Sequence, residues 1–317
     1  MVRVGVVGCA AFARRRMLPA MAAHPDIELV AVASRDAAKA VEVAGEYGCR
    51  PVTGYRELIE DAAVDAVYVP LPAAMHAEWV EAALTAGKHV LAEKPVTTDA
   101  ARTRELFALA RSRDLTLMEN VMFLQHAQHT EVRKMLADGV IGELRAFHAA
   151  FAIPGLPDSD IRYRPELGGG SLFDIGIYPI RAAVHFLGCD LRIRGAVLTR
   201  SPGREVDTSG AVLLSAPAGV SAQLTFGMEH AYRSMYQLWG STGRITVERA
   251  FTPPADFAPD VRVESASGTE TVSLAPDDQV ANTLTAFVGA IRAGGAPPGD
   301  CLAQADLLDA VRRLAVS

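Results

Sequence analysis

The sequence predicts an α/β fold in two parts: an N-terminal doubly wound parallel sheet, then an α+β domain with an open, largely antiparallel sheet. Over the first 120 residues, short β-rich runs alternate with helical stretches. These runs are apolar throughout, as expected of parallel strands covered on both faces. After Gly142 several runs alternate apolar with polar residues, which is typical of an antiparallel sheet with one covered face.

The first part is expected to hold five strands with helices between them. The predicted strands are Arg3–Val7, Leu29–Ser34, Ala66–Val69, His89–Ala92 and Thr116–Glu119. The predicted helices include Ala37–Tyr47, His76–Ala86 and Ala100–Arg113. We place a domain boundary near residue 120, which gives domains of residues 1–120 and 121–317.

The second part begins with a predicted strand at Leu144–Ile153, and a loop rich in Pro, Gly and Asp follows through Asp160. Gly168–Gly188 is a glycine-rich turn that runs into a helix. The further predicted strands are Arg192–Thr199, Ser209–Ser215, Val220–Phe226, Tyr236–Gly240, Gly243–Glu248, Val261–Glu264 and Glu270–Leu274. Helices at Asp278–Ala293 and Cys301–Val316 close the chain, and the last could pack back on the first domain.

The composition is that of an ordinary globular protein, with 50% hydrophobic and 21% charged residues. No apolar run reaches the roughly eighteen residues of a membrane span. The net charge of −6 gives no reason to expect nucleic-acid binding. No metal site is expected, because neither the cysteines nor the His, Asp and Glu residues show ligand spacing. Four scattered cysteines and the lack of a signal peptide predict a cytoplasmic protein with reduced thiols: Cys9, Cys49, Cys189 and Cys301.

The turn after the first strand resembles a dinucleotide-binding (Rossmann) fingerprint, which has glycine at its first, third and sixth positions. The segment reads Gly8-Cys9-Ala10-Ala11-Phe12-Ala13. Alanine is common at the sixth position, whereas Ala10 departs from the pattern. The helix that follows still presents free N–H groups and the positive end of its dipole to a pyrophosphate. An ordinary tight strand–helix turn is the alternative.

The end of the second strand indicates which nicotinamide cofactor is bound. NAD enzymes usually place a carboxylate here for the ribose 2′-hydroxyl, and that charge would repel a 2′-phosphate. Ser34 and Arg35 instead offer a hydroxyl and a guanidinium, which suit a phosphate dianion. We therefore predict NADP(H) rather than NAD(H). The alternative is a solvated Arg35 with Asp36 turned inward.

Glu93-Lys94-Pro95 follows the fourth predicted strand at its carboxyl end, where ligands bind in open α/β sheets. Lys94 there can donate a hydrogen bond to a substrate oxygen and stabilise developing alkoxide charge. Pro95 is compatible with a cis peptide bond that would aim Lys94 inward. The alternative is a surface lysine, the commonest location of this residue.

A second candidate centre follows the glycine run Gly168-Gly169-Gly170. Such glycines allow close approach of the backbone to a ligand, or positive φ angles. A helix that begins near Ser171 would place Asp174 and Tyr178 on one face. A lysine ammonium near Tyr178 would lower the pKa of its phenol, which suits a proton donor. The alternatives are a core tyrosine and a helix-start carboxylate.

Together these motifs resemble the glucose–fructose oxidoreductase / inositol dehydrogenase family over nearly the whole chain. Many members carry histidine where this chain has Tyr178. Further segments resemble the branch of dTDP-sugar 3-ketoreductases of deoxysugar biosynthesis. They include Tyr68-Val69-Pro70-Leu71-Pro72, Met118-Glu119-Asn120, Asp160-Ile161-Arg162-Tyr163 and Phe251-Thr252-Pro253-Pro254.

The resemblance implies NADPH-dependent reduction of the C3 ketone of a dTDP-linked 4-keto-deoxyhexose. Of Lys94 and Tyr178, one would polarise the ketone and the other supply the proton. The resemblance places four residues at the cofactor: Leu71, His76, Glu93 and Arg162. It places Asp174 at a sugar hydroxyl or beside Lys94.

The substrate's diphosphate needs cationic partners, and Arg15 or Arg16, just beyond the phosphate turn, could supply them. Asn120 follows the fifth strand and could face the substrate. Family members commonly pair through the C-terminal sheet, so we expect a homo-oligomer, either a dimer or a tetramer.

Other functions remain compatible with these residues. An NAD(P)-dependent dehydrogenase of a free sugar or dihydrodiol would use Lys94 equally, with Tyr178 as a base. A non-catalytic NADP-binding regulator could share the fold, although a pure binder has no need of either residue. Subunit association could also be the main role of the C-terminal sheet.

Overall fold

The computed structural model describes residues 1–217, 219–295 and 298–315, which form two compact units. The first unit consists of Met1–Val121 together with Val280–Pro298, and the second runs from Met122 to Gln279 and resumes at Gly299. The segment that returns to the first unit therefore precedes the C-terminal helix, which groups with the second. Val316, where the last predicted helix ends, lies outside the described residues.

The first unit is built on a six-stranded parallel sheet in the order β3-β2-β1-β4-β5-β6. Its strands are β1 (Val2–Val7), β2 (Ile27–Ser34), β3 (Arg50–Thr53), β4 (Ala66–Val69), β5 (His89–Glu93) and β6 (Leu117–Asn120). The strand order reverses between β1 and β4, and ligands of doubly wound sheets bind at such a point. The predicted doubly wound fold is confirmed.

The edge strand β3 was not predicted. It is short and contains Pro51, and both Arg50 and Pro51 are exposed, so it lacks the apolar run of a central strand. Only its pairing with Ala31–Ser34 of β2 makes it a strand.

The helices of the first unit are α1 (Leu18–Ala23), α2 (Ala37–Tyr47), α3 (Tyr55–Ile59), α4 (Ala73–Thr85), α5 (Ala100–Ser112) and α8 (Gln279–Arg292). Two of them, α2 and α5, start at an aspartate that caps them. The Asp36 carboxylate accepts hydrogen bonds from two backbone N–H groups of α2, and Asp99 accepts one in α5. An ion pair between Arg292 and Asp26, 2.7 Å long, ties α8 to the loop before β2.

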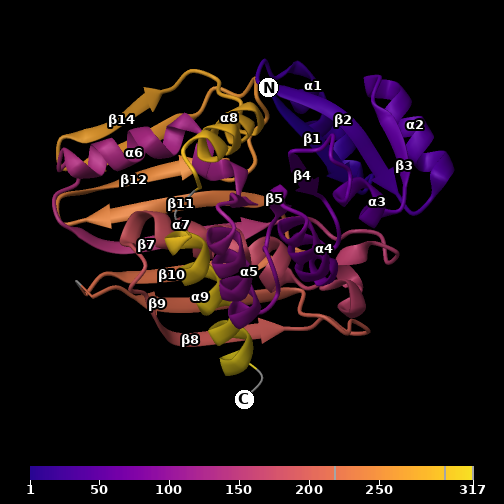
Figure 1. Cartoon of the computed structure of the whole chain (residues 1–317). Coiled ribbons are helices and arrows are strands. Elements are labelled where there is room, and N and C mark those ends of the chain that lie inside the picture. The colour runs from indigo at the N-terminus through magenta and orange to yellow at the C-terminus, as the bar shows by residue number, and fades with distance from the viewer. Residues whose placement is uncertain (218, 296–297, 316–317) are drawn as a thin grey trace. The chain divides into compact units, whose positions relative to one another are not determined.

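The second unit holds an eight-stranded sheet in the order β14-β13-β12-β11-β7-β10-β9-β8, shown in Figure 1. The strands are β7 (Leu144–Ala152), β8 (Arg192–Thr199), β9 (Ser209–Ser215), β10 (Ser221–Gly227), β11 (Arg233–Gly240), β12 (Gly243–Glu248), β13 (Asp260–Ser265) and β14 (Gly268–Ser273). The pairing is antiparallel except between β7 and β10, which confirms a largely antiparallel sheet.

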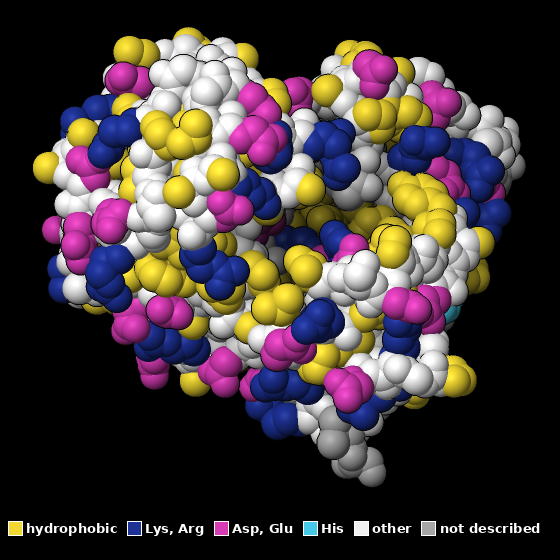
Figure 2. All heavy atoms as spheres, turned by 90° about the vertical axis from the view of Figure 1, so that its right-hand side faces the viewer, with side chains coloured by type: hydrophobic (Ala, Val, Ile, Leu, Met, Phe, Trp, Pro, Cys, Tyr) yellow, Lys and Arg dark blue, Asp and Glu magenta, His cyan; other side chains and the backbone are white. Residues whose placement is uncertain are grey.

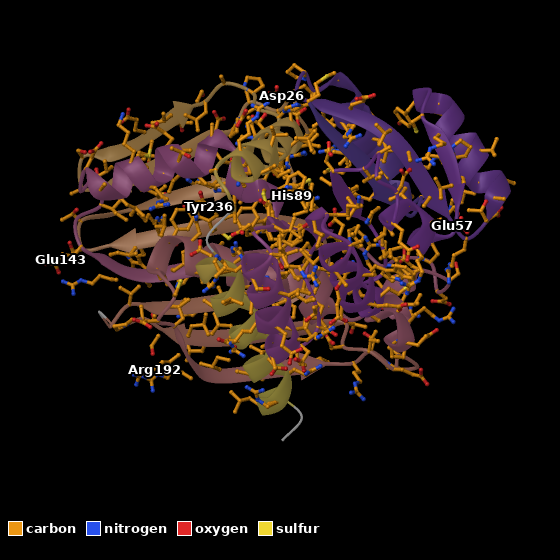
Figure 3. The ribbon with its side chains drawn as sticks, viewed as in Figure 1. Asp26, Glu57, His89, Glu143, Arg192 and Tyr236 are labelled. Atoms are coloured by element: carbon orange, nitrogen blue, oxygen red, sulfur yellow. The ribbon has the colours of Figure 1, made fainter. Side chains whose placement is uncertain are left out.

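One face of this sheet is covered by helices. They are α6 (Ala127–Ala137), which the sequence analysis did not predict, α7 (Ile177–Leu187) and α9 (Gly299–Ala315). Helix α7 lies against β7 and β10, and α9 against β8. Tyr236, labelled in Figure 3, is buried on this face. Its hydroxyl oxygen and Nδ1 of His129 in α6 form a hydrogen bond with 3.0 Å between the two atoms. The labelled Glu143 and Arg192 are exposed.

The surface carries charges of both signs. On the face shown in Figure 2, Lys and Arg side chains are interspersed with Asp and Glu rather than gathered in one patch. Among the described residues, no helix is both long and apolar enough to cross a membrane.

Candidate functional site

The turn after β1 requires glycine at its first position. Gly8 has a φ of +115°, and a Cβ there would lie 2.8 Å from Cδ2 of Leu71. Its N–H donates to the Ala33 carbonyl on β2. The turn leads into a π-helical segment, Ala13–Met17, that continues as α1. The backbone at the β1 carboxyl end is therefore kept free of side-chain bulk, as a pyrophosphate requires.

The end of β2 carries no free carboxylate. Asp36 is committed to capping α2, because one of its oxygens accepts from Ala38 N–H at 2.9 Å and from Lys39 N–H at 3.3 Å. The Ser34 hydroxyl accepts from the Asp36 N–H at 3.1 Å. The alternative in which Asp36 turns inward is thus not what the structure adopts. A hydroxyl and the exposed Arg35 remain at this end of the strand.

A pocket of about 420 Å³ lies between this turn and α2. Its lining residues are Cys9, Ala11, Arg14, Arg15, Lys39 and Glu46. Arg14 forms ion pairs with Glu42 and Glu46 of α2, so its charge is compensated. Lys39 and Arg15 provide further cations. Lys39 was not singled out from the sequence, although a lysine in the first turn of a helix, where acidic residues are favoured, is a usable signal.

Glu93, the last residue of β5, is held by donors from both neighbouring strands. The Tyr68 hydroxyl of β4 and the Asn120 amide of β6 each donate to its Oε1, both at 2.6 Å. Burial and, next, the Glu93 charge raise the pKa of Tyr68 well above its usual 10. The Lys94–Pro95 peptide bond is cis. The structure thus brings together two predicted site residues, Glu93 and Asn120, and fixes the backbone immediately before Lys94.

His76 of α4 is fully buried and bridges two loops that follow strands. Its Nδ1 lies 2.7 Å from the Pro95 carbonyl oxygen, and its Nε2 lies 2.7 Å from that of Leu71. Burial lowers the pKa of His76. The ring links the loop after β4 to the loop that carries Lys94. Both ring nitrogens of His76 are used by backbone carbonyls.

The glycine run in the second unit packs against its own chain. Gly168 has a φ of +76° and ends a short helical turn. A Cβ on Gly169 would lie 2.5 Å from the Arg162 carbonyl oxygen, and one on Gly170 would lie 2.5 Å from Asp207 Oδ1. Two of the glycines therefore adopt positive φ angles, Gly168 and Gly170, and two lie close to other atoms of the protein, Gly169 and Gly170.

Asp174 lies in a π-helical turn, Leu172–Gly176, and α7 starts only at Ile177. A helix does begin near Ser171, as expected, but its first turn is π-helical rather than α-helical. Gly176 accommodates the ring of Phe226, three of whose carbons would lie 3.0–3.1 Å from a Cβ. Arg162 Nε donates to Asp174 Oδ2 at 2.5 Å, and Arg162 Nη1 to Asp160 at 3.2 Å. The structure thus joins two predicted site residues, Arg162 and Asp174.

Tyr178 stands in the first turn of α7 within a wall of phenylalanines. Its ring centroid lies 4.8 Å from that of Phe151, 5.8 Å from Phe251 and 6.0 Å from Phe123. Only 8% of Tyr178 is exposed. The rings fix the plane of the phenol and leave its hydroxyl as the polar end. Lys94 belongs to the first unit and Tyr178 to the second.

The first unit fits NADPH at the end of β2, and it leaves a buried polar atom for a ligand. The end of β2 offers the Ser34 hydroxyl with Arg35 and Lys39 nearby, and its one carboxylate is occupied by the α2 cap. The buried Asn120 Oδ1, at the carboxyl end of β6, has no hydrogen-bond partner among the described residues. An acceptor of this kind is costly unless a ligand or water donates to it.

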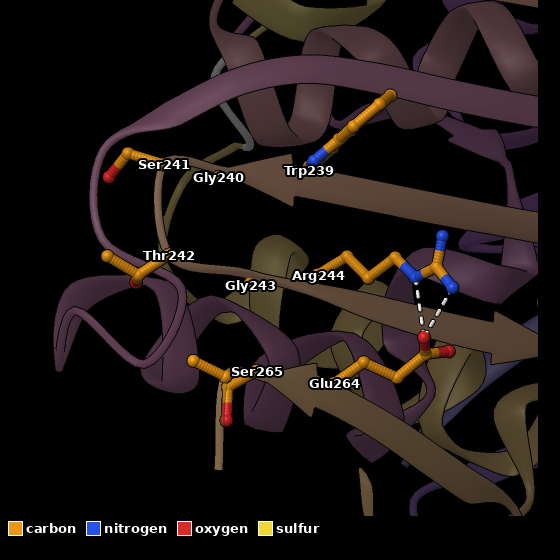
Figure 4. Close-up of a pocket in the computed structure, with 9 residues that line it drawn as sticks. Trp239, Gly240, Ser241, Thr242, Gly243, Arg244, Glu264 and Ser265 are labelled. Carbon is orange, nitrogen blue, oxygen red and sulfur yellow. Dashed lines mark hydrogen bonds and ion pairs between the residues drawn. The ribbon is translucent and has the colours of Figure 1, made fainter. Parts of the chain in front are cut away.

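A larger pocket, shown in Figure 4, lies at the end of the eight-stranded sheet where β7 starts. It surrounds the β11–β12 turn, where the Arg244 guanidinium pairs with Glu264. Gly240 in this turn pairs with Leu144 at the start of β7, whereas Arg162 follows the other end of that strand. It is therefore separate from the predicted reacting groups of the second unit.

Comparisons with known proteins agree with the fold and extend it. Residues 2–121 match the model of an oxidoreductase family with an NAD-binding Rossmann fold, and residues 129–246 match that of the GFO/IDH/MocA C-terminal domain. The dTDP-3,4-didehydro-2,6-dideoxy-alpha-D-glucose 3-reductase of Streptomyces antibioticus is 52% identical, covering 99% of this chain and 97% of its own. The reductase of the same name from Actinomadura kijaniata is 53% identical over 98% of this chain and 95% of its own.

A solved structure is equally similar. KijD10, a 3-ketoreductase from Actinomadura kijaniata in complex with NADP and TDP-benzene, has a TM-score of 0.96 at 52% identity, covering 99% of this chain and 97% of that one. The two family matches lie one in each unit, and the two enzymes match almost end to end. This chain therefore belongs to the GFO/IDH/MocA family of oxidoreductases.

Proposed function

We propose that this protein is an NADPH-dependent reductase of the C3 ketone of a dTDP-linked 4-keto-deoxyhexose. The observation that carries the proposal is the similarity to KijD10 over 99% of the chain, because that enzyme was solved with both NADP and TDP-benzene. The curated relatives at 50–55% identity all share the name of a dTDP-sugar 3-reductase. The activity is that of an oxidoreductase in deoxysugar biosynthesis.

The cofactor is NADP(H). The cap formed by Asp36 removes the carboxylate that would repel a 2′-phosphate, while Ser34, Arg35 and Lys39 supply a hydroxyl and two cations. We assign the pyrophosphate to the turn after β1, which consists of Gly8, Cys9, Ala10, Ala11, Phe12 and Ala13. Leu71, His76 and Glu93 line the same carboxyl end of the sheet, and Arg162 is assigned to the cofactor from the second unit.

The reacting groups in this proposal are Lys94 and Tyr178. Solved variants of KijD10 replace one lysine and, separately, one tyrosine, and each complex retains NADP and TDP-benzene. In KijD10 those two residues stand 84 positions apart, the same separation as that between Lys94 and Tyr178. This agreement supports the assignment of the pair.

NADPH, when bound, supplies the hydride for C3. Lys94 donates a hydrogen bond to the ketone oxygen and stabilises the negative charge that develops there. The Tyr178 hydroxyl transfers its proton to the same oxygen. Asp174 binds a sugar hydroxyl or the Lys94 ammonium, and Asn120 and Arg15 bind the substrate. The phenylalanines around Tyr178 hold its ring and exclude water from it.

Purified protein should oxidise NADPH faster than NADH when a dTDP-3,4-diketo-2,6-dideoxyhexose is generated in situ, and a dTDP-4-keto sugar should accumulate. Free aldoses and dihydrodiols with NADP⁺ serve as comparison substrates. Turnover of a free sugar without turnover of the nucleotide sugar would replace the proposal with a free-sugar dehydrogenase. NADPH binding without turnover of any substrate would indicate a non-catalytic regulator.

We also propose a homo-oligomer that forms through the uncovered face of the eight-stranded sheet. Several outward residues there are apolar and exposed, among them Val197, Leu213 and Trp239 with 61%, 41% and 52% exposure. Exposed apolar side chains on an uncovered sheet face are typical of an interface. A cytoplasmic location is proposed because the four cysteines form no disulfide bond among the described residues, as is typical of reducing compartments.

A further inference from the structure

The start of the helix that carries Asp174 and Tyr178 is bound by a residue from a distant loop. Asp207 lies in the β8–β9 connection, and one oxygen of its carboxylate accepts from the Ser171 hydroxyl at 2.6 Å and from the Leu172 N–H at 2.7 Å. Its backbone carbonyl accepts from the Ser171 N–H at 2.8 Å. One residue therefore satisfies two of the N–H groups that the start of a helix leaves without intrahelical partners.

The local sequence offers no substitute for this cap. The residue at the N-cap position, Ser171, makes no capping bond of its own, because its hydroxyl is directed to Asp207. Gly170 has a φ of +115°, and a Cβ there would lie 2.5 Å from Asp207 Oδ1. The missing side chain is what allows the carboxylate to approach. The negative charge of Asp207 also complements the positive end of the helix dipole.

Asp207 is itself anchored to the sheet. The next residue, Thr208, donates its N–H to Thr199 at the end of β8, and its carbonyl accepts from Met228 just after β10. The cap thus fixes the π-helical turn at a set height above the strands. Asp174 lies in that turn and Tyr178 one turn later, so a shift of the turn displaces both side chains.

The same loop reaches Asp174 by a second route. Arg204 donates to Glu229 at 3.1 Å, and its guanidinium lies 3.7 Å from the ring centroid of Tyr163. Tyr163 adjoins Arg162, which donates to Asp174. The β8–β9 loop therefore holds Asp174 in two ways. Asp207 fixes the backbone of the turn that contains Asp174, and Arg204 packs on the segment that contains Arg162, the ionic partner of Asp174.

We propose that Asp207 is a positioning residue for the reduction, and that it acts through the π-helical turn to hold Asp174 and Tyr178 in the geometry for proton transfer. The inference rests on the proposed function for its kinetic consequence. Its structural consequence, a fixed backbone in the segment Leu172–Gly176, is independent of that function.

The experiment compares Asp207→Ala, Asp207→Asn and the matched control Asp158→Ala, whose carboxylate binds the same loop but is 90% exposed. Because small displacements of reacting groups are costly, Asp207→Ala should lower kcat about 30-fold or more and leave the KM for NADPH within about threefold. Asp207→Asn keeps an acceptor oxygen and should recover most of kcat. Asp158→Ala should behave as wild type.

A double-variant measurement separates positioning from general destabilisation. In a Tyr178→Phe background the proton donor is already lost, so Asp207→Ala should lower kcat by less than about threefold further. The proposal would be overturned if the kcat loss of the double variant equalled the product of the losses of the two single variants. It would also be overturned if Asp207→Ala had the kcat of wild type. Should Asp207→Ala not fold, Ser171→Ala removes one of the capping bonds. A wild-type kcat in that variant would overturn the proposal equally.

Hydrogen exchange provides a readout that needs no substrate. Amide protons of Leu172–Gly176 should exchange faster in Asp207→Ala than in wild type or Asp158→Ala, whereas those of the β1–β6 sheet should not change. Unchanged exchange in this segment would contradict the inference even if the enzyme is active. If wild type shows no reductase activity but the exchange pattern holds, the proposed function fails while the structural role of Asp207 stands.

Discussion

Tyr68 and Glu93 form a hydrogen bond across neighbouring parallel strands, with 2.6 Å between the phenolic oxygen and Oε1. Tyr68 is fully buried, and its hydroxyl donates to the carboxylate of Glu93, the residue that precedes Lys94. The amide of Asn120 reaches the same oxygen from the other side. The backbone that precedes Lys94, the proposed reacting lysine, is thus coupled to three adjacent strands of the first unit.

Tyr68→Phe removes one of these two donors and should lower the free energy of unfolding by about 1–3 kcal/mol, as for the loss of a buried hydrogen bond to a charged group. Denaturant unfolding of the protein without cofactor measures the change. Tyr55→Phe, another buried tyrosine of this unit, is the matched control. Equal stabilities of the two variants would show that the Glu93 bond contributes little.

Lys94→Ala and Tyr178→Phe should each lower turnover by about a hundredfold or more, because each removes a group that we propose to act on the ketone oxygen in the transition state. NADPH affinity, measured by titration of fluorescence, should remain within about a few-fold of wild type. A variant with near-wild-type turnover would remove its residue from the mechanism.

Arg35→Ala and Lys39→Ala should each weaken NADPH binding by roughly 10- to 100-fold, the loss expected for a charge-assisted hydrogen bond to phosphate. NADH binding should not change, because NADH lacks the 2′-phosphate. Arg35→Asp should shift the preference toward NADH. Arg56→Ala, an exposed arginine of α3, is the control. If Lys39→Ala binds NADPH as wild type does, the pocket beside α2 does not hold the 2′-phosphate.

Stability should fall as the pH falls below about 6.5, through His185. Burial lowers the pKa of His185 from 6.5 to about 4, so the unfolded chain takes up a proton that the folded chain excludes. The contribution is constant above pH 6.5. Below it, the free energy of unfolding should drop by about 1.4 kcal/mol per pH unit, or about 3 kcal/mol in all by pH 4.

Unfolding curves at several pH values test this, with His185→Leu as the variant that should show a shallower slope between pH 6.5 and 4. His126 and His129 contribute in the same direction, because burial lowers the pKa of both. Parallel slopes for wild type and His185→Leu would contradict the assignment to His185.

Trp239→Glu should dissociate the proposed oligomer, because it places a charge in the apolar patch on the uncovered sheet face. Sedimentation velocity would then give a monomer where wild type gives a dimer or tetramer. Val41→Glu changes a comparably exposed apolar residue of α2 and should leave the assembly intact. An unchanged sedimentation coefficient in Trp239→Glu would place the interface elsewhere.

Much of the fold follows from local patterns in the sequence. Apolar runs indicate the central strands β1, β4 and β5, and alternation of apolar with polar residues indicates β8, β9 and β12. The bounds of β8, β9 and β12 match the prediction at both ends. The edge strand β3 and helix α6 were not predicted, because β3 has few apolar residues and α6 is rich in polar ones. For these two, tertiary contacts outweigh local preference.

The site divides in the same way. By itself the sequence determined the chemical types at each position: the turn at Gly8, the hydroxyl and guanidinium after β2, Lys94 after β5, and Tyr178 after a glycine run. Each of these is a short segment whose residue types and spacing carry the signal.

Only the tertiary structure decided which of these groups are held, and by what. Asp36 caps its own helix, and Glu93 accepts hydrogen bonds from two neighbouring strands. The cap on the turn that holds Asp174 comes from Asp207, 35 positions after Leu172. Such contacts depend on backbone path and on which side of a strand or loop a residue faces. Those properties arise from the packing of distant segments, and no spacing along the chain encodes them.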